Sequence, residues 1–324
     1  MLSLVGPDRS GTTVLGNILG EVEGITNAGE MRWLWRRGLR ERRPCGCGRP
    51  PVECPRWSDV LDRVRPELTR STRREDFDAA VSEVMTAQGE VLALRNRVRL
   101  LSSVNSRELD WPALSCTRAV TAELCRSLVE VTGAPLIVDT SKLVAVAALL
   151  AGDDRIDHYV LQVTRDPRAV AFSWQRPKPL PLAGGMGTMA TVGTSSTVAW
   201  WMLASLEAEL LRRRIPRDRW MLLKYEDFVQ HPKASVDRVL AFLEVSAPGP
   251  FVADDTVALG TNHTLAGNPN RFRTGLVQIR EDDEWRSRMA QRDRIIIGAA
   301  AYPLLVRYGY PLRTGLHGSK LART

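Results

Sequence analysis

Short apolar runs alternate with longer segments of helical periodicity along the chain. Leu2–Val5 is mostly apolar and leads into a loop bounded by Gly6 and Gly11. After the loop, apolar residues recur at helical spacing, which predicts a helix over Gly11–Val22. The pattern therefore predicts a strand, a glycine-bounded loop and a helix at the beginning of the sequence.

Three later segments repeat this plan. Pro135–Lys142 predicts a buried parallel strand that runs into a helix, and His158–Thr164 predicts a strand followed by a helix from about Arg168. Arg219–Pro232 predicts another strand and a short helix, which Pro232 closes. Strands that alternate with helices indicate the α/β class, with a central parallel sheet flanked by helices.

The remaining segments complete this outline. Residues 56–132 carry long helical patterns and are expected to form a helical insertion. Lys178–Ser196 is rich in Gly, Pro, Thr and Ser, which predicts a mobile loop. Because no repeat or linker divides the chain, we expect a single domain over residues 1–312 and a polar, frayed tail at 313–324.

Composition and charge narrow the classes of partner. The 324 residues are 44% hydrophobic and 25% charged, which is typical of a globular protein with a large core. A net charge of +8 favours anionic ligands. No apolar run reaches the roughly 18 to 20 residues that span a bilayer. With a strand predicted from Leu2, which leaves no room for a signal peptide, we expect a cytoplasmic protein.

Three of the five cysteines cluster in PCGCGRPPVECPRW, at Cys45, Cys47 and Cys54. An odd number of cysteines in a cytoplasmic chain argues against a disulfide framework. The spacing is compatible with a zinc site, but the sequence offers no clear fourth ligand. A zinc site and a structured loop with reduced cysteines both remain open.

The loop after the first predicted strand has the spacing of a phosphate-binding loop. Gly6 and Gly11 are five positions apart, as in GxxxxGK[ST], but Thr12 stands where that pattern has lysine. Backbone N–H groups, the helix N-terminus, the Arg9 guanidinium and the hydroxyls of Thr12 and Thr13 are suitable anion ligands. Without the lysine, the loop suits a 5′-phosphosulfate better than a triphosphate. The alternative is a strand-turn-helix without a ligand.

A second motif, VTRDPRAVAFSW, follows the strand predicted at His158–Thr164. Arg165 ends that strand, and Ser173 lies eight residues further on, about two helical turns away. Residues at the carboxyl end of a parallel strand face the same crevice as the first loop. Arg165 and Ser173 are therefore candidates to bind a second phosphate group, although each is also unremarkable on a protein surface.

Together, the motifs LVGPDRSGTTVL and VTRDPRAVAFSW resemble those of the PAPS-dependent sulfotransferases. These enzymes have a P-loop-like α/β architecture and use 3′-phosphoadenosine 5′-phosphosulfate (PAPS) as sulfuryl donor. The resemblance implies that the first motif binds the 5′-phosphosulfate and the second binds the 3′-phosphate. The residues implied are Arg9, Ser10, Gly11, Thr12 and Thr13 for the 5′ end, and Arg165 and Ser173 for the 3′-phosphate. Arginine at position 9 is more similar to tyrosylprotein, carbohydrate and many bacterial sulfotransferases than to the cytosolic ones.

Two further segments extend the resemblance to the reacting groups. NAGEMRWLW resembles the segment of tyrosylprotein sulfotransferases whose glutamate is the general base, which implies that role for Glu30 and an orienting role for Arg32. The alternative for Glu30 is an ion pair with neighbouring arginines. IVDTSK places Lys142 after a strand, where some family members have a lysine that faces the sulfuryl group.

Two more segments imply contacts with the nucleotide. KYEDFVQHP resembles the tyrosylprotein sulfotransferase segment whose tyrosine contacts the nucleotide, which implies that role for Tyr225. HTLAGNPNRFRTG resembles a segment that closes over the nucleotide in bacterial relatives, with Arg271 and Arg273 as candidates. His263, in the same segment, is a candidate for the acceptor pocket.

The resemblance implies sulfuryl transfer from PAPS to a hydroxyl or phenol without a metal. Arg9, Thr13 and Lys142 would then stabilise the sulfuryl oxygens and the leaving 5′-phosphate. A small metabolite, a sugar, a lipid and a peptide tyrosine all remain open as acceptors, and we favour a small molecule acted on by a bacterial-type enzyme.

Two other functions remain as alternatives. A P-loop kinase would use Asp139, at the end of LIVDTS, to hold magnesium, but it would need a lysine at position 12. A protein that binds nucleic acid would use residues 32–49, which hold seven arginines against one glutamate. That segment matches no recognisable nucleic-acid module, so we expect no nucleic-acid partner.

Overall fold

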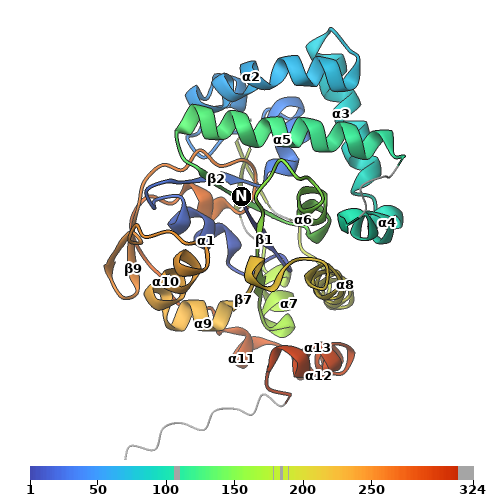
Figure 1. Cartoon of the computed structure of the whole chain (residues 1–324). Helices are drawn as coiled ribbons and strands as arrows, with labels where there is room; N and C mark the ends of the chain where they lie inside the picture. The colour runs from blue at the N-terminus through green and yellow to red at the C-terminus, as the bar shows by residue number, and fades with distance from the viewer. Residues whose placement is uncertain (106–109, 178, 183–184, 189, 313–324) are drawn as a thin grey trace, which may run out of the picture.

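The computed structural model describes residues 1–312 apart from 106–109, 178, 183–184 and 189. Its centre is a five-stranded sheet in the order β2-β3-β1-β4-β7, whose neighbouring strands all run parallel (Figure 1). The strands are β1 (Leu2–Val5), β2 (Ile25–Gly29), β3 (Leu136–Lys142), β4 (Tyr159–Thr164) and β7 (Trp220–Lys224). The predicted α/β class and parallel sheet are confirmed, and β2 is a strand that the pattern did not predict.

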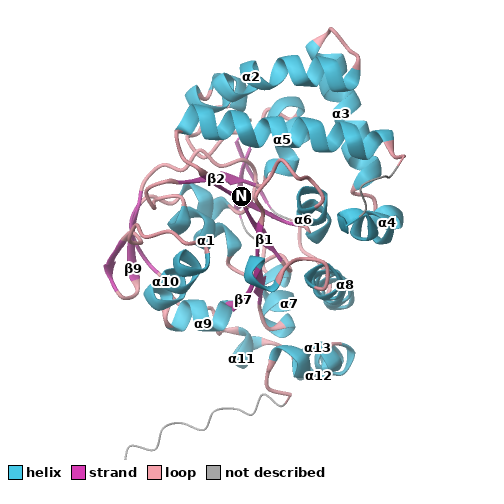
Figure 2. Ribbon diagram, in the orientation of Figure 1, coloured by secondary structure: helices cyan, strands magenta, loops and turns pink. Residues whose placement is uncertain are grey.

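Helices cover both faces of the sheet (Figure 2). One face carries α1 (Thr12–Leu19), α9 (Tyr225–Gln230) and α10 (Pro232–Phe242), and the other carries α6 (Val144–Ala151), α7 (Pro167–Gln175) and α8 (Thr194–Arg212). Side chains of a strand alternate between faces. Leu4 accordingly packs in the core that α1 and α10 share, whereas Val5 packs in the core that α6 and α8 share. The predicted helix from Gly11 to Val22 is shorter, because Gly11 caps its beginning and Gly20 its end.

A layer of helices lies beyond the β2 edge of the sheet, in the upper part of Figure 1. It consists of α2 (Pro55–Thr72), α3 (Phe77–Val91), α4 (Arg97–Ser102) and α5 (Pro112–Thr132). The side chain of Asp76 accepts a hydrogen bond from the backbone N–H of Ala79 (2.8 Å) and so caps α3. Trp57 is fully buried among α2, α3 and α5. These helices occupy residues 55–132, where the sequence indicated helices.

The segment between α7 and α8 differs from the prediction. The expectation of a loop over Lys178–Ser196 is wrong for the antiparallel strands β5 (Pro179–Leu182) and β6 (Gly185–Thr188), and α8 already begins at Thr194. Proline and glycine dominated the prediction, but proline is tolerated in edge strands, and a two-stranded ribbon has only edges. Residues 178, 183–184 and 189 of the predicted loop lie outside the described residues.

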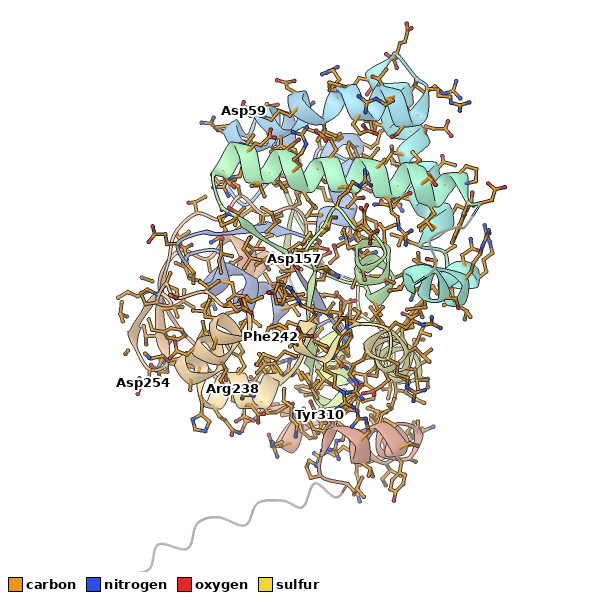
Figure 3. The ribbon with its side chains drawn as sticks, viewed as in Figure 1. Asp59, Asp157, Arg238, Phe242, Asp254 and Tyr310 are labelled. Atoms are coloured by element: carbon orange, nitrogen blue, oxygen red, sulfur yellow. The ribbon has the colours of Figure 1, made fainter. Side chains whose placement is uncertain are left out.

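The last third of the chain adds a second small sheet and a helical end. The sheet joins β8 (Phe251–Ala253), β9 (Thr256–Leu259) and β10 (Gly275–Gln278) in the order β10-β9-β8. The closing helices are α11 (Trp285–Arg288), α12 (Gln291–Ala300) and α13 (Tyr302–Tyr308). Side chains fill the space between these layers (Figure 3). The tail predicted at 313–324 lies outside the described residues.

Short 3₁₀ and π segments join the larger elements. They are η1 (Met31–Trp33), the π-helical η2 (Leu34–Arg40), η3 (Pro51–Glu53), η4 (Leu94–Asn96), η5 (Ser103–Asn105), η6 (Arg217–Arg219) and η7 (Pro269–Phe272). Among the described helices, none combines the length and the apolar character needed to cross a bilayer.

Candidate active site

Residues at the carboxyl ends of all five strands of the central sheet line one cavity of about 360 Å³. Arg9 follows β1, and Glu30 follows β2. Lys142 ends β3, Arg165 follows β4 and Tyr225 follows β7. In an open α/β sheet this edge forms the ligand-binding crevice. The fold therefore brings together five residues that are far apart in the sequence and that the sequence analysis had singled out.

The loop between β1 and α1 is packed too closely to tolerate side chains at its glycines. Gly6 has a φ of +134°, and a β-carbon there would lie 2.1 Å from the carbonyl oxygen of Val163. Gly11 has a φ of +80°, and its β-carbon would lie 2.7 Å from the ring of Tyr225. Only glycine allows both the left-handed backbone and the close approach. The five-residue glycine spacing thus fits the loop between β4 and α9.

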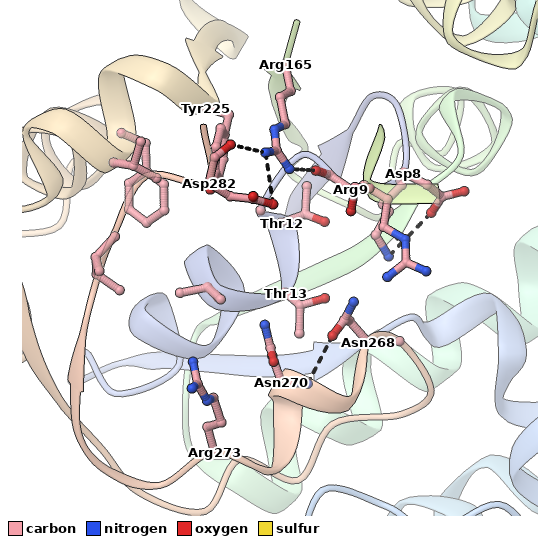
Figure 4. Close-up of a pocket in the computed structure, with 18 of the residues that line it drawn as sticks. Asp8, Arg9, Thr12, Thr13, Arg165, Tyr225, Asn268, Asn270, Arg273 and Asp282 are labelled. Carbon is pink, nitrogen blue, oxygen red and sulfur yellow. Dashed lines mark hydrogen bonds and ion pairs between the residues drawn. The ribbon is translucent and has the colours of Figure 1, made fainter. Parts of the chain in front are cut away.

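The first motif supplies most of one cavity wall. Its lining residues are Asp8, Arg9, Gly11, Thr12, Thr13 and Val14. Figure 4 shows Thr12 and Thr13 between Arg165 at one side of the cavity and Arg273 at the other. Ser173 of α7 also lines the cavity, whereas Ser10 is fully buried and is not among the lining residues.

Arg165 is fixed at the cavity wall by several contacts. Its guanidinium donates hydrogen bonds to the backbone carbonyls of Arg9 (2.9 Å) and Asp282 (2.9 Å), and it lies 4.2 Å from the centre of the Tyr225 ring. It also forms an ion pair with the carboxylate of Asp282 at 3.3 Å (Figure 4). Burial raises the pKa of Asp282, but the charges of Arg165 and Arg176 outweigh it and lower that pKa below its ordinary value.

A buried ion pair joins Glu30 and Lys142 beside the first loop. The ammonium of Lys142 donates a hydrogen bond to Oε1 of Glu30 and lies 4.0 Å from Oδ1 of Asp8. Burial raises the pKa of Glu30, but Lys142, together with Arg32 and Arg37, lowers it below its ordinary value. Glu30 is therefore an ionised carboxylate near neutral pH. Its partner is Lys142 rather than the neighbouring arginines that the sequence suggested as an alternative.

Two of these residues have a strained backbone. Arg9 has a φ of +67° and Lys142 a φ of +64°, although neither is glycine. The backbone N–H of Gly6 donates to the carbonyl oxygen of Lys142 (3.0 Å), which holds the end of β3 against the beginning of the loop. Left-handed conformations of ordinary residues are costly and tend to persist at functional sites. Here they turn two cationic side chains toward the same cavity.

The segment after β9 forms the opposite wall. Its lining residues are Gly267, Asn268, Asn270, Arg273, Val277, Gln278, Ile279, Arg280 and Asp282. Leu265 ties this segment to the sheet, because its backbone N–H donates to the carbonyl of Ala28 (2.9 Å) and its carbonyl accepts from the N–H of Glu30 (2.8 Å). Arg273 lines the cavity, but Arg271 does not. Its buried guanidinium donates to the carbonyls of Thr264 (2.8 Å) and Pro44 (2.7 Å).

A second cavity of about 400 Å³ adjoins the first at the ion pair. Both cavities are lined by Asp8, Arg32, Lys142 and Trp174. The other walls of the second cavity are mainly apolar and come from α6, α7 and α8. They include Leu143, Val144, Val170, Val192, Trp200, Trp201, Leu203 and Ala204. Lys142 therefore lies where a charged cavity meets a mainly apolar one.

Comparison with known proteins identifies the family. The model of the sulfotransferase family matches residues 2–249, which are most of the chain and include β1 to β7. The chain belongs to the sulfotransferase family. No curated protein sequence matches it significantly.

Solved sulfotransferases share the fold at low sequence identity. The sulfotransferase domain from the curacin biosynthetic pathway is 16% identical, with a TM-score of 0.53, over 97% of this chain and 98% of that chain. The sulfotransferase domain of the Synechococcus PCC 7002 olefin synthase is also 16% identical, with a TM-score of 0.47, over 96% of this chain and 94% of that chain. The expected sulfotransferase architecture is thus confirmed.

The main cavity of this sulfotransferase is strongly cationic. Seven lysine and arginine residues line it against three carboxylates, so an anionic ligand fits its field. Asp139, the residue that a kinase would use for magnesium, does not line it. Oδ1 of Asp139 accepts hydrogen bonds from the N–H of Met31 (3.1 Å) and from Ser141, and burial raises its pKa to about 6. These contacts give Asp139 a structural role between β2 and β3.

The arginine-rich segment 32–49 is divided between several roles in the sulfotransferase. Arg32 and Arg37 line the main cavity, whereas Arg36 and Arg43 form ion pairs with Glu41 (3.3 and 2.6 Å). The sequence analysis did not single out Asp282 or Arg280, because the segment that holds them has no motif. Their position became visible only when β10 placed that segment over the cavity.

Proposed function

We propose that this sulfotransferase moves the sulfuryl group of PAPS to a hydroxyl of a small molecule, with Glu30 as general base. The observation that carries the proposal is the cavity at which all five strands end, because it unites the two motifs with Glu30 and Lys142. The donor is treated as a substrate that binds in this cavity.

The chemistry of the lining residues supports a phosphosulfate at the first loop. Thr12 and Thr13 offer hydroxyl groups at the N-terminus of α1, where the helix dipole favours an anion. Arg9 offers a planar set of donors. Arg165 and Ser173 lie on the far side of the same loop and are the proposed ligands of the 3′-phosphate, with the Tyr225 ring beside them.

The proposed reaction requires one base and fixed positive charge. The acceptor hydroxyl gives its proton to the Glu30 carboxylate while its oxygen forms a bond to sulfur. The bond between sulfur and the 5′-phosphate oxygen breaks, and adenosine 3′,5′-bisphosphate leaves. Lys142 and Arg9 stabilise the negative charge that develops on the sulfuryl and phosphate oxygens. The lowered pKa of Glu30 keeps it ionised and able to accept the proton.

The second cavity supports a class of acceptor. It meets the donor cavity at Lys142 and Arg32, and its apolar walls include Trp200 and Trp201. A hydroxyl or phenol carried on an apolar or aromatic body would bury that body against these walls, with its oxygen directed to Glu30. We therefore propose an apolar alcohol or phenol rather than a highly polar sugar.

Calorimetric titration tests the donor site. We expect adenosine 3′,5′-bisphosphate to bind the wild-type protein tightly and without magnesium, and ATP with magnesium to bind weakly. Arg165→Ala should weaken the bisphosphate by about 10²-fold or more, because charge-assisted contacts to a phosphate contribute roughly 1.5 to 3 kcal/mol each. The control Arg63→Ala, an exposed residue of α2 that pairs with Glu130, should leave binding unchanged.

Either of two results would contradict this proposal. Magnesium-dependent binding of ATP with no preference for a 3′-phosphate would favour the kinase alternative. Equal affinity of the Arg165→Ala and Arg63→Ala proteins would remove Arg165 from the donor site.

A further inference from the structure

The cysteine cluster acquires a fourth partner in the folded chain. Cys45, Cys47, Cys54 and His263 each place one sulfur or nitrogen atom so that all four atoms lie within 4.8 Å of one another. The fourth residue is 209 positions from Cys54 in sequence, which is why the sequence alone offered no candidate. His263 lines neither cavity, so its expected place in the acceptor pocket is wrong.

We propose that these four side chains bind a structural zinc ion. Three thiolates and one imidazole are the ligand set of a closed, four-coordinate zinc site, with no position left for a substrate. The alternative of a structured loop with reduced cysteines leaves the convergence of a distant histidine on the same point without a reason.

The distances within the cluster suit a tetrahedral ion. Sγ of Cys54 lies 3.7 Å from Sγ of Cys45 and 3.1 Å from Nδ1 of His263. Ideal zinc bond lengths imply ligand separations of about 3.8 Å between two sulfurs and about 3.6 Å between sulfur and nitrogen. The sulfurs are much farther apart than the roughly 2.05 Å of a disulfide. A small outward movement of the imidazole is all that coordination requires.

The backbone around the cluster is already arranged. The N–H of Gly48 donates to the carbonyl of Cys45 (2.9 Å), and a φ of +84° at Gly48 completes this tight turn. Gly46 packs against the segment of His263, since its N–H donates to the carbonyl of Thr264 (2.9 Å) and a β-carbon at Gly46 would lie 1.9 Å from the carbonyl oxygen of Asn262. The two segments are therefore held together before any ion binds.

The surroundings favour thiolates and exclude water. Cys45 and Cys54 are fully buried, and Cys54 is the N-cap of α2, where the helix dipole stabilises negative charge. Three thiolates and a zinc ion carry a net charge of −1. Arg56 and Arg271 lie close enough to the cysteines to interact with that charge. The indole N–H of Trp57 donates to the backbone carbonyl of His263 (2.8 Å) and holds that residue in place.

The proposed ion would join three parts of the molecule at one point. Cys45 and Cys47 end the segment that begins at Glu30, and Cys54 begins the helical layer. His263 precedes the segment that lines the donor cavity from Gly267 onward. The ion is therefore a structural link between the catalytic base, the helical layer and the wall of the donor site.

Metal analysis of the full chain tests the proposal. The protein is purified under reducing conditions without a polyhistidine tag, and its metals are measured by mass spectrometry. We expect one zinc per chain. Cys54→Ser and His263→Ala should lose it, whereas His263→Cys should retain it because a fourth thiolate replaces the imidazole. Cys116→Ser is the matched control, since Cys116 lies in α5 outside the cluster and should leave the zinc content unchanged.

Cobalt substitution provides a second readout that does not depend on activity. Tetrahedral Co²⁺ with thiolate ligands should give intense visible bands and a charge-transfer band in wild type and Cys116→Ser, and a spectrum of a different ligand set in His263→Cys. The proposal is overturned if folded wild-type protein neither contains zinc nor takes up one equivalent of added Zn²⁺. It is also overturned if the Cys54→Ser and His263→Ala proteins, folded by circular dichroism, keep one zinc per chain.

Discussion

Glu30 and Lys142 show how one side chain sets the protonation state of another. Without the ammonium, burial would raise the pKa of Glu30 and leave part of it protonated, and therefore unable to accept a proton. Lys142 reverses that effect and also borders both cavities. A single residue thus keeps the proposed base ionised and lies where sulfuryl transfer would occur.

Removing the carboxylate of Glu30 should separate chemistry from binding. Glu30→Gln keeps the shape of the side chain but cannot take up a proton, so we expect turnover to fall by about 10²- to 10⁴-fold. Affinity for adenosine 3′,5′-bisphosphate should change little. Steady-state kinetics with a phenol acceptor and calorimetry measure the two quantities, with Glu130→Gln on the exposed face of α5 as control. Unchanged turnover in Glu30→Gln would exclude Glu30 as the base.

His158 should make folding stability depend on pH. It precedes β4, its Nε2 lies 2.8 Å from Oγ of Ser3, and burial lowers its pKa to about 3. In the unfolded chain its pKa is near 6.5, so between about pH 6.5 and 3 the unfolded state binds a proton that the folded state does not. Its contribution to stability is therefore complete above pH 6.5 and is lost as the pH falls.

The variant His158→Gln isolates this effect, because the other titrating groups are common to both proteins. As the pH falls from 6.5 to 4.5, the free energy of unfolding of wild type should decrease relative to the variant by up to about 1.4 kcal/mol per pH unit. Urea denaturation at several pH values measures the difference. Parallel stability curves for the two proteins would show that His158 is not buried in its neutral form.

At the scale of elements, the loop between β1 and α1 depends on two close approaches. Gly6→Ala would place a β-carbon 2.1 Å from a β4 carbonyl at a φ of +134°. We expect the free energy of unfolding to fall by about 3 kcal/mol or more, because both the backbone conformation and the strand spacing must change. Urea denaturation and bisphosphate affinity should both report the damage.

A glycine in an exposed helix provides the opposite control. Gly89 lies in α3, and a β-carbon there would have no neighbour within 4 Å. Gly89→Ala should therefore raise the free energy of unfolding by about 1 kcal/mol. If both glycine variants had the same small effect, the close packing of Gly6 against β4 would be refuted.

The sequence predicted those elements whose residues have a strong local signature. β1, β3, β4 and β7 were predictable because apolar runs of strand length precede turns or helices. β2 was not, since Ile25–Gly29 has one large apolar residue and owes its place to pairing with β3. The pair of Arg165 and Asp282 was equally hidden, because it joins a motif to a segment without one.

Ligand binding should connect distant parts of the whole molecule. The donor cavity lies between the first loop and the segment after β9, which are more than 250 positions apart. We expect adenosine 3′,5′-bisphosphate to slow amide hydrogen exchange in residues 6–13 and 267–282 and to leave α2 and α3 unaffected. Mass spectrometry of the exchanged peptides measures this pattern. Protection confined to residues 32–49 would indicate a different anion site.

The order of the strands also has a consequence for synthesis. β1 is central in the sheet, yet its neighbours β3 and β4 are translated later, and 131 positions separate Val5 from Leu136. At 5 to 20 residues per second, the nascent β1 waits roughly 7 to 26 seconds for its first partner on the ribosome. Meanwhile α2, α3 and α5 have emerged and can pack through contacts that are closer in sequence. The helical layer can therefore fold during translation, whereas the nucleotide-binding loop takes shape only after β4 has left the exit tunnel.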